Sequence, residues 1–527
     1  MAPRAVGRPG QPHALILAID VGTTAVKAAI VDETGAIVST GSAAQRTLGD
    51  ERGGREHEPA ATWRAVQAAV RRALSTPDHA RQVRAISVTG PRGTFRVLGP
   101  DGQPRSRFLT WQDRRAADTA ATLSMRDDGR YRTISGTALE PSVVLPKLVW
   151  LRDEEPRLFE GPWALATPQG DVLARLGADG QVVDLTVAAH VGLLDVTRLS
   201  WSGTLLAEFD VPQRAMPRLV EPGAQVGRLD PRIAAAWRLP AGIPLVAAGS
   251  DGVCSELGAG VTEPGQVYAY LGTAAAVAGP ITAPRLPGDP ALKLLPGSVR
   301  ERWRIVALAG AGASVRDWFM ATHGLRDQAR VERLIAESPP GARGALFLPT
   351  LAGASAPVPD GRARGVFAGL TLAVRTADLA RAVHEGVALE LRWMIAAMRD
   401  SIPMPTEIRL TGGGSRSDGW SRIIADALGV PVARVTEPHP GLRGAACYGW
   451  SAVGRFGSAL EAARALDTGV DWFVPGRDCG ALYDEAAESY ALVRRAFHEG
   501  GVDGRLFRQR PPAGLRSPES PPPGRQR

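Results

Sequence analysis

Short apolar runs alternate with amphipathic stretches along most of the chain. Several runs have the length and the Val, Ile and Leu content of buried β-strands, and all but the first contain glycine at or near their end: LILAI, AISVTG, PLVAAGS, GQVYAYLGTAAAVAG, RIVALAG and EIRLTGGGS. Two segments repeat their apolar residues at helical spacing: TWRAVQAAVRRAL, which opens with Thr62 as a candidate N-cap, and LARAVHEGVALELRWMIAAMRD. Strands that alternate with helices predict an α/β fold.

Two strand-turn-strand units resemble one another and suggest two lobes. The first contains IDVGTTAVKAAI and the second YLGTAAAVAG, each with a Gly-Thr turn between apolar strands. We expect two similar lobes facing one another, residues 14–253 and 254–505, with the boundary in the run AAGSDGVCSELGAG. The Pro- and Arg-rich ends, residues 1–13 and 506–527, have little to bury and are predicted to be disordered tails.

Composition narrows the classes of partner. The net charge of +8 comes from 62 Lys and Arg against 54 Asp and Glu, spread without a basic stripe, which argues against a nucleic-acid partner. Three cysteines are too few and too far apart for a disulfide framework or a CxxC metal site, which favours a reducing cytoplasm. No uncharged apolar run approaches the length of a membrane span, and the apolar run before Asp20 is too short for a signal-peptide core. We therefore expect a cytoplasmic protein without a membrane partner.

The first strand-turn-strand unit carries side chains suited to phosphate. Gly22 permits a tight turn, the amides and hydroxyls of Thr23 and Thr24 can point at phosphate oxygens, and Lys27 adds positive charge. Asp20, at the end of a buried strand, could hold a hydrated Mg²⁺ that bridges phosphates. The unit is not a GxxxxGK[ST] loop and leads from strand to strand, so no helix N-terminus follows. Taken alone, it is equally compatible with a plain β-hairpin.

The pattern DxGTTxxKxxxxDxxG resembles the first phosphate loop of the superfamily of sugar kinases, heat-shock-protein-70 chaperones and actin. Three further segments resemble the FGGY family of carbohydrate kinases, which includes xylulokinase and glycerol kinase: ISVTGPRGTFRVLGPDGQPRSRFLTWQDRRAAD, LFLPTLAGASAPVPDGRARGVFAGL and LTGGGSRSDGWSRIIADALG. The matches run in family order from Ile16 to about Val453. The resemblance implies two actin-like (ribonuclease H-like) lobes with an ATP cleft between them.

The resemblance also assigns the residues of phosphoryl transfer. Asp251 matches the catalytic aspartate that accepts the hydroxyl proton, and with Asp20 it is the expected Mg²⁺ site. From its local sequence alone, Asp251 could equally be a helix N-cap. The remaining ATP-binding residues match the second phosphate loop and the adenosine segment: Gly272, Thr273, Gly412, Gly413, Gly414 and Ser415. The run AGAGASV, around Gly310 to Ser314, is a further candidate border of the nucleotide that the resemblance does not align.

For the sugar, Trp111 could stack on a C–H face, Asp113 could accept hydroxyl protons, and Arg92 beside Gly93 could donate to a hydroxyl. The alternative for Trp111 is a core aromatic residue. The chain departs from relatives at Pro91, where many have Gln, and at Gly93, where glycerol kinases have an acid. The segment GASAP, residues 353–357, lacks the Glu-Arg pair that relatives often carry.

The expected function is an ATP- and Mg²⁺-dependent kinase that phosphorylates a primary hydroxyl of a small ketose or polyol, xylulose first and glycerol or another short polyol second. The departures at Pro91 and GASAP leave open a non-catalytic ATP-binding relative. Retention of Asp20, Lys27 and Asp251 argues against it, because a pure binding protein needs no base. A homodimer is the candidate assembly.

Overall fold

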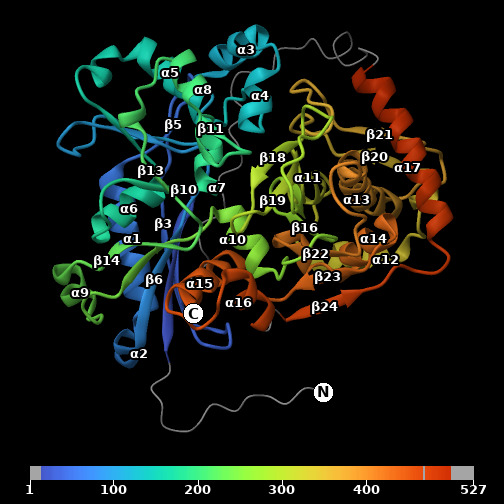
Figure 1. Ribbon diagram of the computed structural model, residues 1–527. Coiled ribbons are helices and arrows are strands. Elements are labelled where there is room, and N and C mark those ends of the chain that lie inside the picture. Colours follow the sequence, from blue (N-terminus) through green and yellow to red (C-terminus); the bar gives the residue numbers. More distant parts are fainter. Residues whose placement is uncertain (1–13, 467–468, 500–527) are drawn as a thin grey trace.

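The computed structural model describes residues 14–466 and 469–499, so both predicted tails lie outside the described residues. Two large mixed β-sheets, each covered by helices, lie side by side (Figure 1). Helices and strands alternate along the chain, which confirms the predicted α/β class.

The first sheet has six strands, and its centre is parallel. The parallel strands β1, β6 and β15 are adjacent, while β2 and β3 continue antiparallel on one side and β14 on the other. In spatial order the strands are β14 (Ala224–Arg228), β15 (Pro244–Ala247), β6 (Val83–Thr89), β1 (Leu15–Val21), β2 (Ala25–Val31) and β3 (Ile37–Ala44).

The second sheet repeats this pattern. Its parallel centre is β16, β22 and β23, with β17 and β19 continuing antiparallel beside β16, as β2 and β3 do beside β1. The predicted similarity of the two strand-turn-strand units therefore extends to whole sheets. In spatial order the strands are β18 (Lys293–Pro296), β19 (Trp303–Ala309), β17 (Ala275–Ile281), β16 (Gln266–Leu271), β22 (Glu407–Thr411), β23 (Val432–Val435) and β24 (Val470–Phe473).

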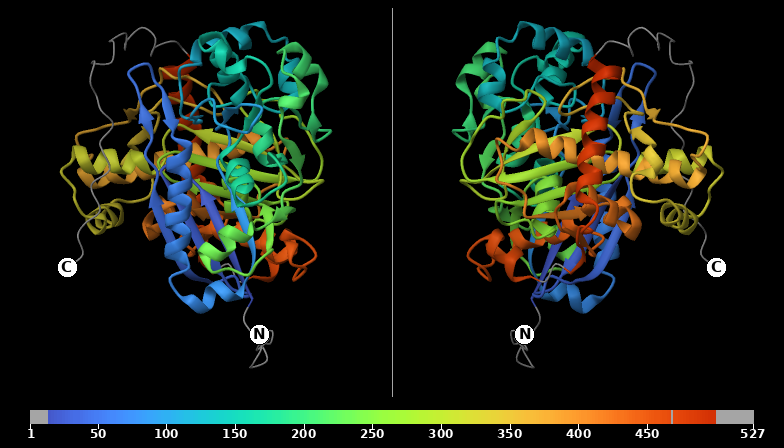
Figure 2. Two further views of the ribbon diagram at one scale, coloured as in Figure 1. Left: turned by 90° about the vertical axis from the view of Figure 1, so that its left-hand side faces the viewer. Right: turned by 90° about the vertical axis from the view of Figure 1, so that its right-hand side faces the viewer.

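The helices cover both sheets, and α17 lies along the outer side of the second (Figures 1 and 2). They are α1 (Pro59–Ala73), α2 (Pro77–Gln82), α3 (Ala117–Arg126), α4 (Arg130–Ser135), α5 (Val144–Glu154), α6 (Pro168–Leu176), α7 (Leu185–Ala188), α8 (Gly203–Glu208), α9 (Pro231–Trp237), α10 (Asp251–Gly258), α11 (Ala313–Thr322), α12 (Gln328–Glu337), α13 (Thr376–Met398), α14 (Asp418–Leu428), α15 (Pro440–Ala452), α16 (Ala459–Ala465) and α17 (Gly480–Arg494). The short strands are β4 (Leu48–Gly49), β5 (Arg55–His57), β7 (Arg96–Leu98), β8 (Phe108–Leu109), β9 (Ala164–Ala166), β10 (Val182–Asp184), β11 (Leu194–Asp195), β12 (Ser200–Trp201), β13 (Arg218–Val220), β20 (Leu346–Leu348) and β21 (Val366–Ala368).

Two predicted helix starts were wrong. Helix α1 begins at Pro59 with Glu58 at the N-cap position, so Thr62 is a buried residue of the first turn rather than the cap. Proline suits a first helical position because its fixed φ is helical and its missing N–H is not needed there. In α10 the N-cap position belongs to Ser250, and Asp251 is the first helical residue. The long helix predicted from LARAVHEGVALELRWMIAAMRD is confirmed as α13.

Helices α10 and α15 touch backbone to backbone. A Cβ on Gly258 would collide with the carbonyl oxygen of Pro440, and one on Gly444 would collide with that of Cys254. Only glycine permits so close an approach at these two positions. Helix α10 therefore has one fixed position against α15.

Helix α15 also packs on the first sheet, although it follows the second sheet's strand β23 in sequence. The Ser87 hydroxyl donates to the Ala445 carbonyl at 2.6 Å, and Ile16 lies against Gly449. Residues of β1, β2, β6 and β15 share one buried apolar cluster with residues of α10, α15 and α16. The lobe boundary expected after residue 253 remains a prediction, and α10 spans it.

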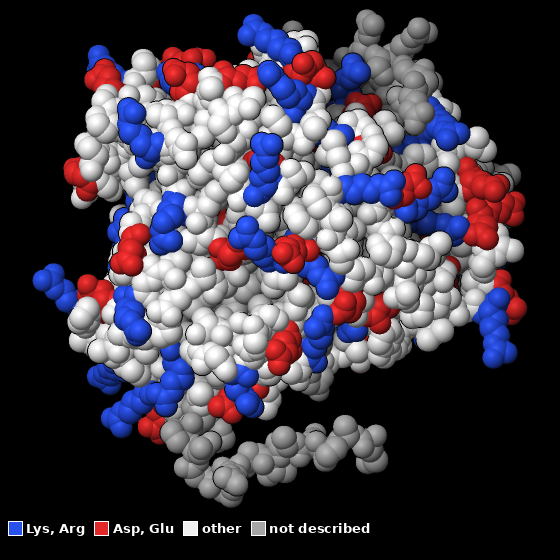
Figure 3. Space-filling model, viewed as in Figure 1, with Lys and Arg blue, Asp and Glu red and all other residues white. Residues whose placement is uncertain are grey.

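Three features bear on the expected partners: the distribution of surface charge, the state of the cysteines and the length of the apolar helices. On the face in Figure 3, positive and negative side chains are interspersed rather than gathered into a stripe of one sign. Cys254, Cys447 and Cys479 are free thiols. Within the described ranges, no helix has the length and apolar character needed to cross a bilayer.

The glycine contact predicts a stability effect. Gly444→Ala should lower the free energy of unfolding by about 2 kcal/mol or more, because the new methyl group has to push α10 away from α15. Urea unfolding followed by circular dichroism measures the loss. The control is Gly480→Ala in α17, where a Cβ meets nothing within 4 Å. Equal effects of the two substitutions would show that the close approach is unimportant.

Candidate active site

Three parallel strands of the first sheet bring Asp20 and Asp251 to one edge. Asp20 in β1 lies opposite Thr89 in β6, and the Thr89 hydroxyl donates to the Gly249 carbonyl at 2.6 Å. The Asp251 amide then donates to the Gly90 carbonyl at 3.0 Å. Carboxyl ends of adjacent parallel strands form such an edge, which explains how residues 231 positions apart come together.

Asp20 lacks compensation for its charge. Its Oδ1 is buried without a hydrogen-bond partner among the described residues. Burial and, to a smaller extent, the negative charge of Asp251 raise its pKa to about 7, although Lys27 on the neighbouring strand opposes both effects. A buried carboxylate beside a second one fits a divalent cation, and Mg²⁺ typically takes one or two carboxylates together with phosphate oxygens. Within the described ranges no cluster of three or more His, Cys, Asp or Glu residues is placed to hold a metal ion.

The first predicted phosphate loop connects β1 to β2. A Cβ on Gly22 would lie 2.7 Å from the Ala25 carbonyl oxygen, so the turn requires glycine. Gln45 holds the loop from the side: its side-chain amide donates to the Gly22 carbonyl at 3.2 Å, and its backbone amide donates to the Thr24 carbonyl at 2.8 Å. The Trp111 indole donates to the Thr23 hydroxyl at 3.1 Å.

The second predicted loop lies at the end of β16 in the other lobe. The amides of Gly312 and Ala313 donate to the carbonyls of Thr273 and Gly272, at 2.8 and 2.6 Å. The Ser314 hydroxyl adds a bond of 2.6 Å to the Thr273 carbonyl. The AGAGASV run, which the family resemblance did not align, therefore holds the backbone of the second loop through these three hydrogen bonds.

The glycine run after β22 is the neighbour of the second loop, because β16 and β22 are parallel and Tyr270 pairs with Thr411. Gly412 has φ +97°, and a Cβ on it would lie 2.6 Å from the Leu271 backbone. A Cβ on Gly413, in contrast, would meet nothing within 4 Å, so this backbone is open on one face. Gly414 packs on Leu271, and the Ser415 hydroxyl bonds internally to the Gly412 carbonyl at 2.7 Å.

The predicted sugar residues divide into two groups. Trp111 is 41% exposed, as a stacking residue requires, rather than part of the core. Asp113 has no exposed side-chain surface and accepts hydrogen bonds from Arg115 and from the Arg55 amide. These contacts favour a positioning role for Asp113 over the expected direct contact with the sugar. Gly93 has φ +68°, and its carbonyl accepts a bond of 2.5 Å from the buried ammonium of Lys147.

Comparison with known proteins agrees with this geometry. Models of the N-terminal and C-terminal domains of the FGGY family of carbohydrate kinases match residues 15–258 and 267–453. The chain belongs to the FGGY family of carbohydrate kinases. It is therefore a phosphotransferase with an alcohol group as acceptor.

Xylulose kinases and glycerol kinases of the FGGY family are about equally similar to this chain. The chain is 31% identical to a xylulose kinase of Klebsiella pneumoniae, over 79% of this chain and 86% of the relative. It is 30% identical to a glycerol kinase of Citrifermentans bemidjiense, over 86% of this chain and 93% of the relative. The solved structure of a xyloylose kinase from Brucella ovis superposes with a TM-score of 0.86 at 27% identity, covering 92% of this chain and 99% of that one. The predicted two-lobed, actin-like fold is thereby confirmed.

Sequence reasoning missed two residues of this FGGY site. The Tyr270 ring lies against Gly272, where a Cβ would collide with it, and burial together with the charge of Asp251 raises its pKa. Tyr270 thus contacts the second loop and lies within range of the charge of Asp251. Arg304 in β19 pairs with the buried Glu256 and approaches the first turn of α10. Tyr270 stands two residues before Gly272 in the quoted segment YLGTAAAVAG, so its position was available in the sequence, whereas only the fold connects Arg304 to the site.

The GASAP segment folds back on the second sheet. The Ala356 amide donates to the Leu308 carbonyl at 2.9 Å, while Ala354 and Asp360 exchange backbone bonds of 2.8 and 3.0 Å. Because Ala354 and Ser355 stand where relatives often have Glu and Arg, that ion pair cannot form here.

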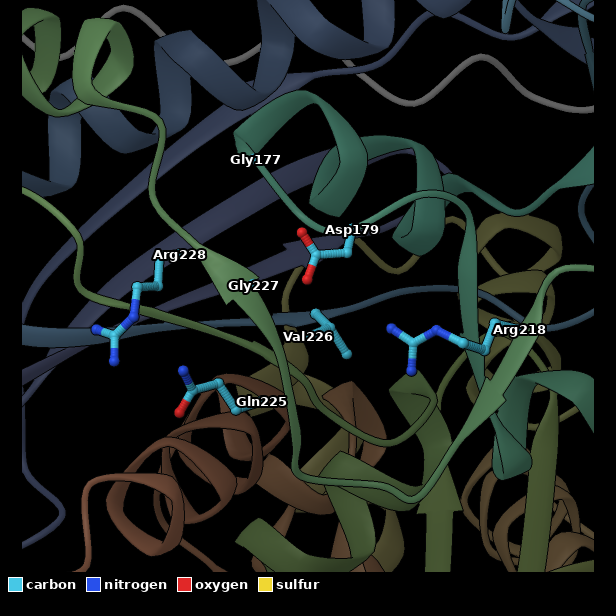
Figure 4. A pocket seen from close by; sticks show the side chains of 7 residues that line it. All are labelled: Gly177, Asp179, Arg218, Gln225, Val226, Gly227 and Arg228. Carbon is cyan, nitrogen blue, oxygen red and sulfur yellow. The ribbon is translucent and has the colours of Figure 1, made fainter.

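A surface hollow of about 820 Å³ contains none of the predicted site residues (Figure 4). It lies between the end of α6 and strands β13 and β14. Its lining is Gly177, Asp179, Arg218, Gln225, Val226, Gly227 and Arg228.

His57, which supports the first loop through Gln45, predicts a pH effect. Its ring nitrogens contact the Gln45 amide at 2.7 Å and the Thr47 hydroxyl at 3.1 Å, and burial lowers its pKa to about 4. Between pH 6.5 and 4 the unfolded chain binds a proton that the folded protein excludes. The free energy of unfolding should therefore fall as the pH is lowered through this range, by at most about 3 kcal/mol from this residue.

Urea unfolding at several pH values tests this contribution. His57→Gln should reduce the slope of the free energy of unfolding against pH between pH 6.5 and 4. The reduction should correspond to at most one bound proton. An unchanged slope in His57→Gln would contradict the assignment.

Proposed function

We propose that this enzyme transfers the γ-phosphoryl group of ATP, with Mg²⁺, directly to a primary hydroxyl of a small sugar or polyol, with Asp251 as the general base. One observation carries the proposal: Asp251 is close enough to Asp20 in its own lobe, and to Tyr270 on the second loop, to raise the pKa of both. A base at Asp251 would then stand near both predicted phosphate loops. The proposal rests on this placement and on family membership.

The chemistry needs a base beside the acceptor hydroxyl and positive charge around the phosphate oxygens. Asp251 would take the hydroxyl proton as the oxygen attacks the γ-phosphorus. Asp20 and Asp251 would hold Mg²⁺, which neutralises phosphate charge when bound. Lys27 lies opposite Asp20 in the backbone register of strands β1 and β2. It would add a fixed positive charge near the first loop.

ATP would bind across both lobes. Thr23 and Thr24 would contact phosphate from the first loop, and Gly272 with Thr273 from the second. The open backbone face at Gly413 suits a flat adenine ring. The Trp111 indole joins the sugar side of the site to the first loop through Thr23, so acceptor binding and phosphate positioning would be coupled.

Among neutral acceptors, a ketopentose such as xylulose ranks first and glycerol second. The first ranking follows the xylulose kinase relatives. The second follows the glycerol kinase relatives and the Arg-Gly-Thr sequence that starts at Arg92.

Asp251→Asn tests the mechanism. Phosphate transfer to the best acceptor should fall by at least about 100-fold, because the amide cannot accept the proton, while affinity for an ATP analogue changes little. A coupled ADP assay and calorimetry measure the two quantities on a panel of ketoses, polyols and their acids. Asp179→Asn, in the surface hollow, is the control. Normal turnover by Asp251→Asn would exclude Asp251 as the base, and no transfer to any acceptor would favour a non-catalytic ATP-binding protein.

Gly413→Ala tests the nucleotide assignment. The added methyl group would stand on the open face and should raise the KM for ATP by about 10-fold, while the free energy of unfolding changes by less than about 0.5 kcal/mol. Gly412→Ala is the contrasting variant, because its positive φ and the Leu271 backbone make it destabilising. An unchanged KM in Gly413→Ala would place the adenine elsewhere.

A further inference from the structure

One buried ammonium group joins three separate stretches of backbone in the first lobe. Lys147 lies in α5 and has no exposed surface. Its Nζ donates to the carbonyl oxygens of Gly93 at 2.5 Å, Thr110 at 2.9 Å and Ser142 at 3.4 Å. An ammonium group has three hydrogens to donate, so backbone carbonyls use all of them.

Two of these stretches carry residues predicted to bind the acceptor. Gly93 directly follows Arg92, and Thr110 directly precedes Trp111. The two stretches also touch: a Cβ on Gly93 would lie 3.3 Å from the Trp111 Cβ, and the Trp111 amide donates to the Thr94 hydroxyl at 3.2 Å. The ammonium group therefore holds the backbone beside the guanidinium-bearing residue and beside the indole-bearing residue.

The third stretch closes the packing around Gly93. A Cβ at this position would lie 2.2 Å from the Ser142 carbonyl oxygen, and φ is +68°. A side chain here, such as the acid of glycerol kinases, would displace an oxygen that accepts from Lys147. The glycine and the buried ammonium group are therefore parts of one local arrangement.

The ammonium group is buried at a cost. Burial lowers the pKa of Lys147 to about 7; the charge of Asp113 opposes this effect, and the charge of Arg114 adds to it. An apolar side chain would avoid that cost, but it would remove a donor from three carbonyl groups. The lysine is therefore better explained by the backbone that it holds than by filling of the core.

The same arrangement is connected to the second sheet. The Ser142 hydroxyl donates to Oε2 of Glu140 at 3.2 Å, and this oxygen accepts a bond of 2.6 Å from Lys293 in β18. Strand β18 pairs with β19, and the AGAGASV run that holds the second phosphate loop follows β19. Direct contacts thus lead from the acceptor segments to the lobe of the second loop.

We propose that Lys147 is a positioning residue of the acceptor site, which sets the spacing between Arg92 and Trp111 through the backbone beside each of them. The pair of Glu140 and Lys293 ties this arrangement to the second sheet. The inference rests on the proposed function, because Arg92 and Trp111 bind the acceptor only in that proposal. A displacement of about 1 Å in either side chain would weaken binding of the acceptor more than binding of the nucleotide.

Lys147→Met tests the positioning role by steady-state kinetics with xylulose, glycerol and the rest of the acceptor panel. The KM for the acceptor should rise by about 10-fold or more, because the two segments lose their common donor, while the KM for ATP changes by less than about 2-fold. Lys147→Arg keeps the charge and the donors and should retain part of the acceptor affinity. An unchanged acceptor KM in Lys147→Met, or equal rises in the two KM values, would overturn the inference.

The matched control is Arg152→Met on the same helix. The Arg152 Nη1 donates to the carbonyls of Phe209 and Asp210, at 3.1 and 3.2 Å, and not to the acceptor segments. Urea unfolding measures the stability that each variant loses. Arg152→Met should lose stability while its acceptor KM changes by less than about 2-fold. A rise as large as that in Lys147→Met would overturn the inference, because it would assign the effect to α5 as a whole.

A milder variant keeps the test decisive if Lys147→Met does not fold. Glu140→Gln combined with Lys293→Met replaces both members of the ion pair, so that no charge is left alone. Its acceptor KM should rise by about 2-fold or more. An unchanged value would overturn the connection to the second sheet, and the whole inference where Lys147→Met is unfolded.

Transfer by the wild-type protein separates this inference from the function on which it rests. If the wild-type protein phosphorylates an acceptor and the variants keep its KM, the function stands and the positioning role fails. If it phosphorylates no acceptor, the proposed function fails, together with the acceptor site that Lys147 would position.

Discussion

The contact between Gly258 and Gly444 determines where the proposed base stands. Helix α10 carries Asp251 at its first position and Gly258 at its last, and Gly258 lies directly on the backbone of α15. Helix α15 in turn packs on β1 and β6, the strands that lead to Asp20 and Arg92. Because interiors are close-packed, a shift of α15 would be transmitted to Asp251. The relative position of the two carboxylates therefore depends on a contact that contains no polar side chain.

Unbalanced charge is the second organising feature. On one side, burial and the charge of Asp251 raise the pKa of Asp20, an effect that a bound cation would oppose. On the other side, burial lowers the pKa of Arg92 and of Arg304, and the charge of Asp251 opposes that effect in both. Groups with shifted pKa values are typical of functional sites.

The motifs with local causes were predictable from the sequence. Gly22 and Gly412 are required by close backbone approaches within a turn or between neighbouring strands, and such turns have recognisable sequences. The alternation of apolar strands and amphipathic helices predicted the α/β class, and the repeated Gly-Thr turn suggested the two similar sheets. The N-cap positions considered at Thr62 and Asp251 lie four residues and one residue too late, because propensity alone locates helix ends poorly.

The sequence by itself determined the fold class, the two glycine-rich loops and, through family resemblance, the residue that we propose as the base. The tertiary structure decided which charges face one another. Arg304 reaches α10 only because the second sheet packs beside the first. The ion pair between Asp113 and Arg115 is likewise seen only in the folded structure. Side-chain partners separated by tens or hundreds of residues depend on packing, whereas a turn or a strand depends mainly on its own neighbours.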